Sequence, residues 1–235
     1  MVVIFLLLLQ LTVAERGPAA FKARVGAFEA RSRELAERRG VEARGKAALT
    51  WLESLRLVLA AIPFERTPNP IFKAWLDTRT ELVVYSEPAG EWFVRHDVIW
   101  KLHDEHRDSA SAESIAWIGA LTGIPGECEG YIPCYAYGLN AREGEYLRRH
   151  SAGRHIKDAL EQIAKTVDLS VDDLLARPDR SDFLKVPDDC GDLLTSLAPL
   201  RESVAAVTDD AVNRTLIAID RLRANCDVTQ IRPRG

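Results

Sequence analysis

The stretch that decides the fold is Cys190–Cys226, which reads CGDLLTSLAPLRESVAAVTDDAVNRTLIAIDRLRANC. Aliphatic residues recur in it at intervals of three and four, which is the spacing of one apolar helix face. This spacing predicts helices over 190–206 and 209–225, joined by a short turn in which Thr208 or Asp209 caps the second helix. The two helices form an antiparallel hairpin, and the interior Pro199 kinks the first of them.

Similar patterns fill most of the chain ahead of this hairpin. An N-terminal hairpin is expected from helices at 18–39 and 43–61, with Gly40-Val41-Glu42 as the link. Helix is also predicted from Ala89 to about His106, whereas Leu82–Tyr85 fits an extended or a helical segment. Further helices are expected at 71–77, 112–121, 134–149 and 154–167, with a shorter one opening at Ser170–Asp173.

The fold class that follows is all-α, with helical hairpins packed as a bundle or an irregular solenoid. Three prolines between residues 63 and 70 mark a boundary between modules. The predicted organisation is a signal peptide at 1–14, an N-terminal helical hairpin at 15–62, a linker with a short helix at 63–88, and a main helical domain at 89–235.

The first fourteen residues, Met1–Ala14, resemble a secretory signal. Val2–Leu11 is apolar apart from Gln10, and charge begins at Glu15. Such a run is too short to span a bilayer, which takes about 20 residues, but it fits the apolar region of a signal peptide. The basic start of a usual signal is missing, and a buried N-terminal helix of a cytosolic protein is the alternative. We expect a signal helix, a periplasmic or secreted protein, and no membrane span after signal removal.

Four cysteines support export, because an even number in an exported chain indicates two disulfides. In the C-terminal hairpin, the start of one helix lies beside the end of the other, so Cys190 and Cys226 are placed to bond. Cys128 and Cys134 are six residues apart across a loop and can close it into a ring. We predict the pairs 128–134 and 190–226. A zinc site is the alternative, but the spacing of Cys128 and Cys134 is wider than zinc motifs use.

The net charge of the chain argues against a protein built to bind nucleic acid. The chain has a net charge of -4 and a pI of about 5.8. Proteins built to hold nucleic acid usually carry a basic face, so no nucleic-acid partner is expected. With 47% hydrophobic and 28% charged residues, the chain is typical of a globular protein.

The histidines suggest one metal site. His96, His103 and His106 are spaced so that a continuous helix places them on one face, with acidic residues between them. Three imidazoles on one face could bind zinc, and such a site could serve a metal-dependent hydrolase. A solvated, charged helix face explains the same residues. The spacing also differs from H-E-x-x-H, because His103 and His106 are three residues apart.

A glycine-rich loop at Gly123–Tyr131 matches neither of the nucleotide-binding motifs G-x-x-x-x-G-K-[ST] and G-x-G-x-x-G. Its glutamates would also repel phosphate. The interpretation we favour is a disulfide-closed turn with glycines at positive φ. Tyr131, Tyr135 and Tyr137 follow it and could line a recognition surface, although packing against the next helix explains them too. No G-x-S-x-G nucleophile motif is present in the sequence.

Two segments of the sequence resemble segments of known groups of proteins. Ser114–Trp117 through GECEG at 126–130, followed by GEYLRRHSAGRH at 144–155, resembles an uncharacterised family of exported bacterial helical proteins, some with an SH3-like domain ahead of this region. Tyr146–Leu160 is also similar to the helix–turn–helix junction of tetratricopeptide-like periplasmic proteins, with Ser151 where proline is usual. The resemblance implies packed helical hairpins and no particular ligand, and no 34-residue repeat accompanies it.

The expected function is therefore a non-enzymatic, exported binding or scaffold module whose partner is another protein or an envelope component. No resident cofactor is expected. The alternative is a metal-dependent hydrolase that holds zinc on His96, His103 and His106.

Overall fold

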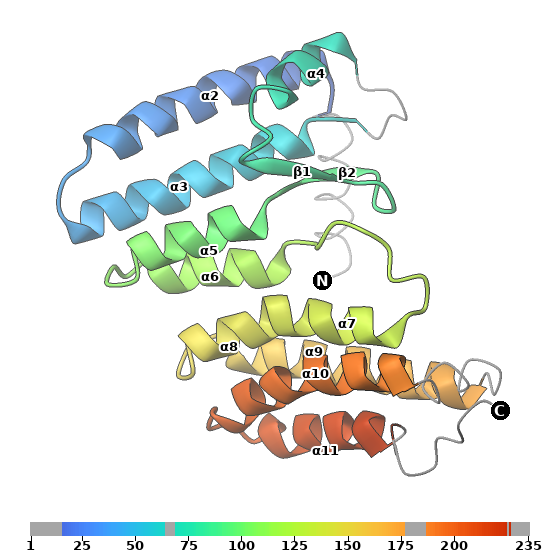
Figure 1. Ribbon diagram of the computed structural model, residues 1–235. Helices are drawn as coiled ribbons and strands as arrows, with labels where there is room; N and C mark the ends of the chain where they lie inside the picture. The colour runs from blue at the N-terminus through green and yellow to red at the C-terminus, as the bar shows by residue number, and fades with distance from the viewer. Residues whose placement is uncertain (1–15, 64–68, 177–186, 225, 227–235) are drawn as a thin grey trace, which may run out of the picture. The chain divides into compact units, whose positions relative to one another are not determined.

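The computed structural model describes residues 16–63, 69–176, 187–224 and 226. The predicted signal peptide at 1–14 lies outside these residues. The described chain is all-α apart from one two-stranded sheet, which confirms the predicted fold class (Figure 1). The chain divides into two compact units, one of residues 1–118 and 122–127, and one of residues 119–121 and 128–235.

The first unit begins with the predicted antiparallel hairpin of α2 (Pro18–Glu37) and α3 (Val41–Ala60). Pro18 starts α2 because its fixed φ suits a first turn. Gly40, at φ 80°, makes the turn between the helices, a conformation that side chains with a Cβ rarely adopt. At the open end, the N–H of Gly17 donates to the carbonyl of Ala61 over 2.9 Å. This bond holds the start of α2 against the end of α3.

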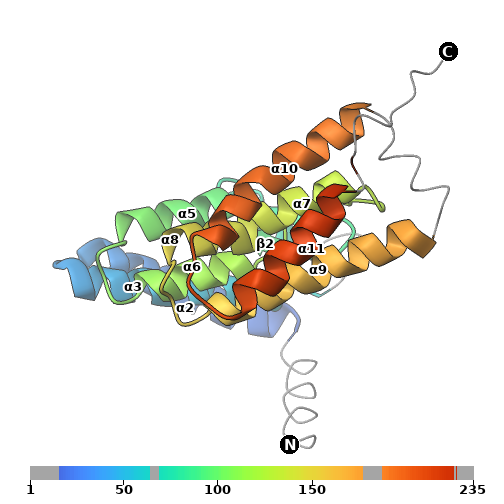
Figure 2. The same ribbon diagram turned by 90° about the horizontal axis from the view of Figure 1, so that it is seen from below.

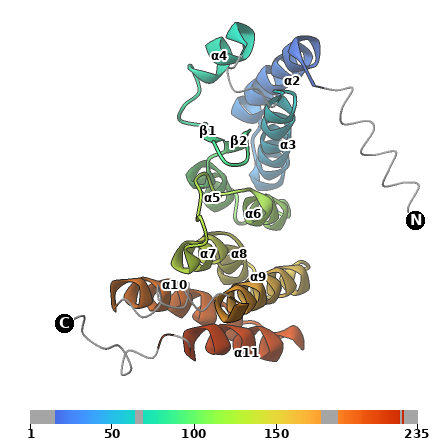
Figure 3. The same cartoon turned by 90° about the vertical axis from the view of Figure 1, so that its right-hand side faces the viewer.

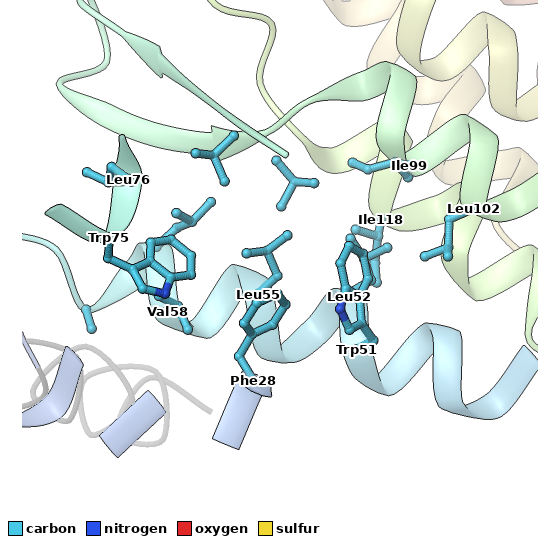
Figure 4. Close-up of a cluster of buried hydrophobic side chains, with 14 of the residues drawn as sticks. Phe28, Trp51, Leu52, Leu55, Val58, Trp75, Leu76, Ile99, Leu102 and Ile118 are labelled. Carbon is cyan, nitrogen blue, oxygen red and sulfur yellow. The ribbon is translucent and has the colours of Figure 1, made fainter. Parts of the chain in front are cut away.

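The core of this unit is an apolar cluster drawn in Figure 4. The short helix α4 (Pro70–Leu76) is capped by Asn69, whose Oδ1 accepts the N–H of Ile71. It inserts Phe72 and Trp75 edge-on against Phe21, with ring centroids 4.9 and 5.7 Å apart. Edge-to-face packing of this kind adds to the gain from burial, so aromatic contacts attach α4 to α2.

The predicted helix from Ala89 is wrong in its first part. Residues Val83–Ser86 form strand β1 and Glu91–Val94 form strand β2, paired antiparallel with Tyr85 opposite Trp92. The turn between them contains Gly90 at φ 61°, whose N–H donates to the carbonyl of Glu87. Branched and aromatic residues on both strands suit this pairing. The helix α5 begins only at His96 and ends at Glu105.

Helix α6 (Ala112–Leu121) is reached through a turn that packs on α3. Gly45 comes so close to Ser109 that a Cβ at position 45 would overlap the serine side chain. The carboxylate of Glu42 accepts the N–H of Ala110 at 3.1 Å. A glycine is therefore required at position 45 for the turn to reach α3.

The second unit contains α7 (Ile132–Leu139), a π-helical turn η1 (Asn140–Gly144), α8 (Glu145–Arg149), α9 (Ile156–Ala176), α10 (Pro187–Ala205) and α11 (Ala211–Ala224). Figures 2 and 3 show α10 lying along α7, and α11 lying along α9. The two disulfides are 128–134 and 190–226, which confirms both predicted pairings. The second joins the open end of the α10–α11 hairpin.

Helix α9 is longer than predicted, because 154–167 and the segment that opens at Ser170–Asp173 form one continuous helix. Ser170 does not cap a new helix. Its Oγ instead donates to the carbonyl of Thr166, one turn earlier, over 2.9 Å. No glycine or proline lies between residues 156 and 176, so nothing in the chain ends the helix there.

Candidate functional site

The three histidines predicted to bind metal lie on and beside α5. His96 is its first residue, His103 lies in its last turn, and His106 follows its end. His103 and His106 are buried, and Nδ1 of His103 lies 3.1 Å from Oδ1 of Asp104. Burial lowers the pKa of His106, and the charge of Arg44 lowers it further, so both favour the neutral ring.

Among the residues described in the structure, no three His, Cys, Asp or Glu side chains are grouped so that they could hold a metal ion. The zinc site therefore stays a prediction, and the placement of the histidines adds no support to it. Because His103 and His106 are buried, a role in packing the first unit explains these two histidines as well as a role in binding metal.

The three tyrosines predicted to bind a ligand lie at the start of the second unit. Tyr135 and Tyr137 on α7 expose 40% and 59% of their surface. Tyr131 instead lies half-buried against α10, with its hydroxyl 2.9 Å from Oδ2 of Asp192 and 3.2 Å from Oδ1 of Asp189. Burial, with these two carboxylates, raises the pKa of Tyr131 to about 12. Two of the three tyrosines thus face solvent, and the third joins the loop to α10.

The loop before α7 has the backbone that its glycines suggest. Gly126 and Gly130 have φ values of 107° and 82°, and Glu129 between the cysteines has φ 46°. The Cys128–Cys134 disulfide closes this turn where α7 begins. The disulfide therefore ties the loop to the first turn of the helix that carries the exposed tyrosines.

A buried carboxyl group that the sequence patterns do not predict lies in the middle of the second unit. Glu143 is 4% exposed and belongs to the π-helical turn η1. Its Oε2 has no hydrogen-bond partner among the described residues, and Nε of Arg142 lies 3.5 Å away. Burial raises the pKa of Glu143, although the charge of Arg142 opposes the change. Single π-helical turns inside α-helices occur frequently at functional sites.

A network of polar contacts surrounds this turn. Arg148 donates to Oδ1 of Asn140 at 2.8 Å and to Oγ of Ser203 at 2.7 Å, which ties α8 to α10. It also pairs with Glu145, as does Arg149. Burial alone would raise the pKa of Glu145, but the hydrogen bonds and charges of the two arginines outweigh it and lower the pKa.

The turn from α8 to α9 is built around one tyrosine. Tyr146 is fully buried, and its hydroxyl accepts the N–H of His155 over 3.1 Å. The ring of His150 stacks on it with the centroids 5.7 Å apart. Tyr146, His150 and His155 thus hold the helical junction together and have a structural role at this turn.

The spacing of apolar residues in the sequence places Glu143 at a position where a buried apolar residue is expected. Leu139 and Leu147 are fully buried, and Glu143 lies four residues from each of them. A carboxylate in the middle of a buried stripe is unusual and marks either a special environment or a functional group. Only 5% of its side chain is exposed, so Glu143 is closed off from solvent by the residues that the structure describes.

Replacing Glu143 with glutamine should stabilise the second unit at pH 7. The pKa of Glu143 is raised in the folded protein, so its contribution to stability is full below the unfolded value of about 4.5 and is lost as the pH rises through the folded pKa. We expect a gain on the order of 1 kcal/mol for Glu143→Gln at pH 7 that disappears near pH 4. Urea unfolding followed by circular dichroism at several pH values measures it.

The matched control is Glu145→Gln, whose pKa is shifted in the opposite direction. Glu145 stabilises the fold above pH 4.5, and this contribution is lost as the pH falls through its lowered folded pKa. Glu145→Gln should therefore destabilise the protein at pH 7. A loss of stability in both variants at neutral pH would contradict the burial argument for Glu143.

None of the helices among the described residues has an apolar stretch long enough to cross a bilayer.

Comparison with known protein families, with curated proteins and with solved structures finds no match for this chain.

Proposed function

We propose that the chain is a non-enzymatic binding or scaffold module that acts outside the cytoplasm. The observation that carries this proposal is the pair of solvent-exposed tyrosines, Tyr135 and Tyr137, on a helix braced by a disulfide. Tyrosine is enriched at protein interfaces because it buries a large area at little cost in side-chain entropy. The partner is another protein or an envelope component.

The two disulfides indicate an oxidising environment of the extracellular type. Together with the apolar N-terminal run, they support export to the periplasm or secretion. A rigid helical surface suits this role, because the braced loop and helix lose little conformational freedom when a partner binds.

Site-specific photo-cross-linking tests this proposal. A photoreactive phenylalanine derivative is placed at position 137, and in a control chain at position 169 of α9, where the native Leu169 is 60% exposed. We expect a discrete cross-linked partner from position 137 and none from position 169 in cells that produce the protein. Equal cross-linking at both positions, or none at either, would contradict a binding role for α7.

Metal analysis of the purified full-length chain distinguishes the competing hydrolase. Stoichiometric zinc that is removed by a chelator and lost in His103→Ala would favour the metal-dependent enzyme. Absence of bound metal after equilibration with zinc, in protein that still cross-links from position 137, would leave the binding module as the supported function.

A further inference from the structure

The two disulfides of the second unit differ in their access to solvent. Cys128 and Cys134 are both partly exposed, and exposed residues lie directly beside each of them in the chain. Cys190 and Cys226 are instead 0% and 5% exposed. A thiolate opens a disulfide by attacking one of its sulfur atoms, so access to the sulfur controls the rate. A dissolved thiolate can therefore reach the first bond, whereas the fold shields the second.

The backbone inside the short ring favours the open form. Glu129 has a φ of 46° and is followed by Gly130 at 82°. Glycine adopts such values freely, but the Cβ of Glu129 is crowded there, which costs free energy. The two residues form the turn in which the N–H of Tyr131 donates to the carbonyl of Cys128. Opening the disulfide frees the Cys128 end of this turn, so Glu129 can leave the left-handed region.

The other end of the ring belongs to a helix. Cys134 is the third residue of α7, and its N–H donates to the carbonyl of Tyr131 over 3.1 Å. Pro133 fixes the backbone one residue earlier, in the first turn of the helix. This half of the ring keeps its conformation without the S–S bond, because helical hydrogen bonds hold it. Cys134 thus stays in place while the segment that carries Cys128 moves.

The charges around the two sulfur atoms differ as well. Cys128 lies between Glu127 and Glu129, both exposed, and their carboxylates disfavour a negative charge on its sulfur. Cys134 lies at the positive end of α7, which no side chain of the described residues caps. A thiolate at the N-terminus of a helix is stabilised, and a more stable thiolate is the better leaving group. Cys134 is therefore the sulfur that leaves.

We propose that Cys128–Cys134 is a thiol–disulfide exchange site, which a dithiol opens while Cys190–Cys226 stays closed. A thiolate of the dithiol attacks Sγ of Cys128 and forms a mixed disulfide. The electron pair of the broken S–S bond leaves on Sγ of Cys134, which takes up a proton. The second thiol of the reagent, after losing its proton, attacks the reagent sulfur of the mixed disulfide and releases Cys128, which is protonated in turn. The two cysteines gain two electrons, and the dithiol is oxidised to a disulfide.

Dithiothreitol is the probe, and Cys190–Cys226 in the same molecule is the control. The full-length oxidised chain is incubated at pH 7, free thiols are blocked with N-ethylmaleimide at intervals, and peptide mass spectrometry locates them. We expect Cys128–Cys134 to open at least about tenfold faster, because the buried sulfurs react only after local unfolding of the α10–α11 hairpin. Equal rates, or faster opening of Cys190–Cys226, would overturn the proposal.

Circular dichroism of the same samples distinguishes exchange in the folded protein from reduction that follows unfolding. We expect the helical signal to stay unchanged while thiols appear at Cys128 and Cys134. Loss of the helical signal in step with these thiols would overturn the proposal. When the reductant is replaced by oxidised glutathione, the same pair should form again. Cysteines that stay bonded to glutathione, or that pair with Cys190 or Cys226, would contradict a reversible site.

Single variants test the order of attack. Cys128→Ser leaves the thiol of Cys134 free, and Cys134→Ser leaves the thiol of Cys128 free. The pH dependence of alkylation by iodoacetamide gives the pKa of each thiol, because the thiolate is the reacting form. We expect the lower pKa for the thiol of Cys134. A lower pKa for the thiol of Cys128 would overturn the assigned leaving group.

The contribution of the backbone is tested by Glu129→Gly beside Glu129→Gln. Both variants remove the same charge, but only glycine relieves the crowding at positive φ. In mixtures of reduced and oxidised dithiothreitol, we expect the ratio of closed to open ring to be about threefold higher for glycine than for glutamine. Equal ratios would show that the backbone at residue 129 does not favour opening.

This inference does not depend on the proposed binding function, and the two can fail separately. Selective exchange at Cys128–Cys134 with no partner cross-linked from position 137 would count against the proposed function alone. A discrete partner cross-linked from position 137, in a chain whose two disulfides open at equal rates, would overturn the exchange site alone.

Discussion

Replacing Cys190 and Cys226 with alanine should lower the free energy of unfolding of the second unit by about 4 kcal/mol, the value that chain entropy gives for a closed loop of this length. The cysteines are 36 residues apart and both buried, so their bond restrains a long loop of the unfolded chain. Urea unfolding followed by far-ultraviolet circular dichroism measures the loss. All five tryptophans lie at or before residue 117, so tryptophan fluorescence follows the first unit.

The control for this variant is the shorter disulfide. Cys128→Ala/Cys134→Ala opens a loop with a separation of six residues, which should cost about 2 kcal/mol. The larger effect at 190–226 and the smaller one at 128–134 should both appear in the circular dichroism transition. The reverse order, or no loss at 190–226, would contradict the view that this bond stabilises the α10–α11 hairpin.

Truncating Phe72 to alanine should destabilise the first unit by about 3–5 kcal/mol, as for other fully buried aromatic residues. Its ring is 1% exposed and lies edge-on against Phe21, so the change leaves a cavity between α4 and α2. Trp75 lies in the same cluster, with its ring centroid 5.7 Å from that of Phe21. Tryptophan fluorescence during urea unfolding therefore reports the loss directly.

Ile71→Ala is the matched control, because Ile71 precedes Phe72 on the same short helix but is 53% exposed. Its effect should stay within about 0.5 kcal/mol, the usual range for exposed positions. Comparable losses in the two variants would show that helix propensity, and not packing of the aromatic cluster, determines the stability of α4.

The helices and the disulfides can be predicted from the sequence because both follow from local patterns. In Cys190–Cys226, the apolar spacing predicts two helices, and the hairpin places its first and last residues together. The N-terminal hairpin is predictable for the same reason, from Pro18, Gly40 and the apolar faces between them. Periodicity of 3.6 residues is a strong signal over about 15 or more residues.

The small sheet could not be predicted, because each of its strands has only four residues. A run as short as Glu91–Val94 fits a helix or a strand equally well by its pattern. Its structure is set by a partner strand and by the turn at Gly90, and neither contact is visible in the spacing of the run itself. The same limit explains the end of α9, where the local pattern at Ser170 is that of a helix cap.

The candidate site could be predicted only in part. Tyr135 and Tyr137 follow a glycine-rich loop, which suggests a recognition surface, and they are exposed. The approach of Tyr131 to Asp189 and Asp192 joins residues 58 and 61 positions apart, a tertiary contact that no local motif predicts. The π-helical turn around Glu143 is a rare single turn inside an α-helix, and no sequence pattern described above predicts it.

The π-helical turn Asn140–Gly144 also sets the direction in which the side chains of α8 point around the helix axis. It adds one residue to a turn of what is otherwise one helix from Ile132 to Arg149. Each residue of an α-helix rotates the chain by about 100°, so the inserted residue turns α8 relative to α7 by about that angle. Without it, the side of the helix that carries Tyr146 and Leu147 into the core would point elsewhere. The junction that Tyr146 makes with His155 therefore depends on one extra residue in the turn before it.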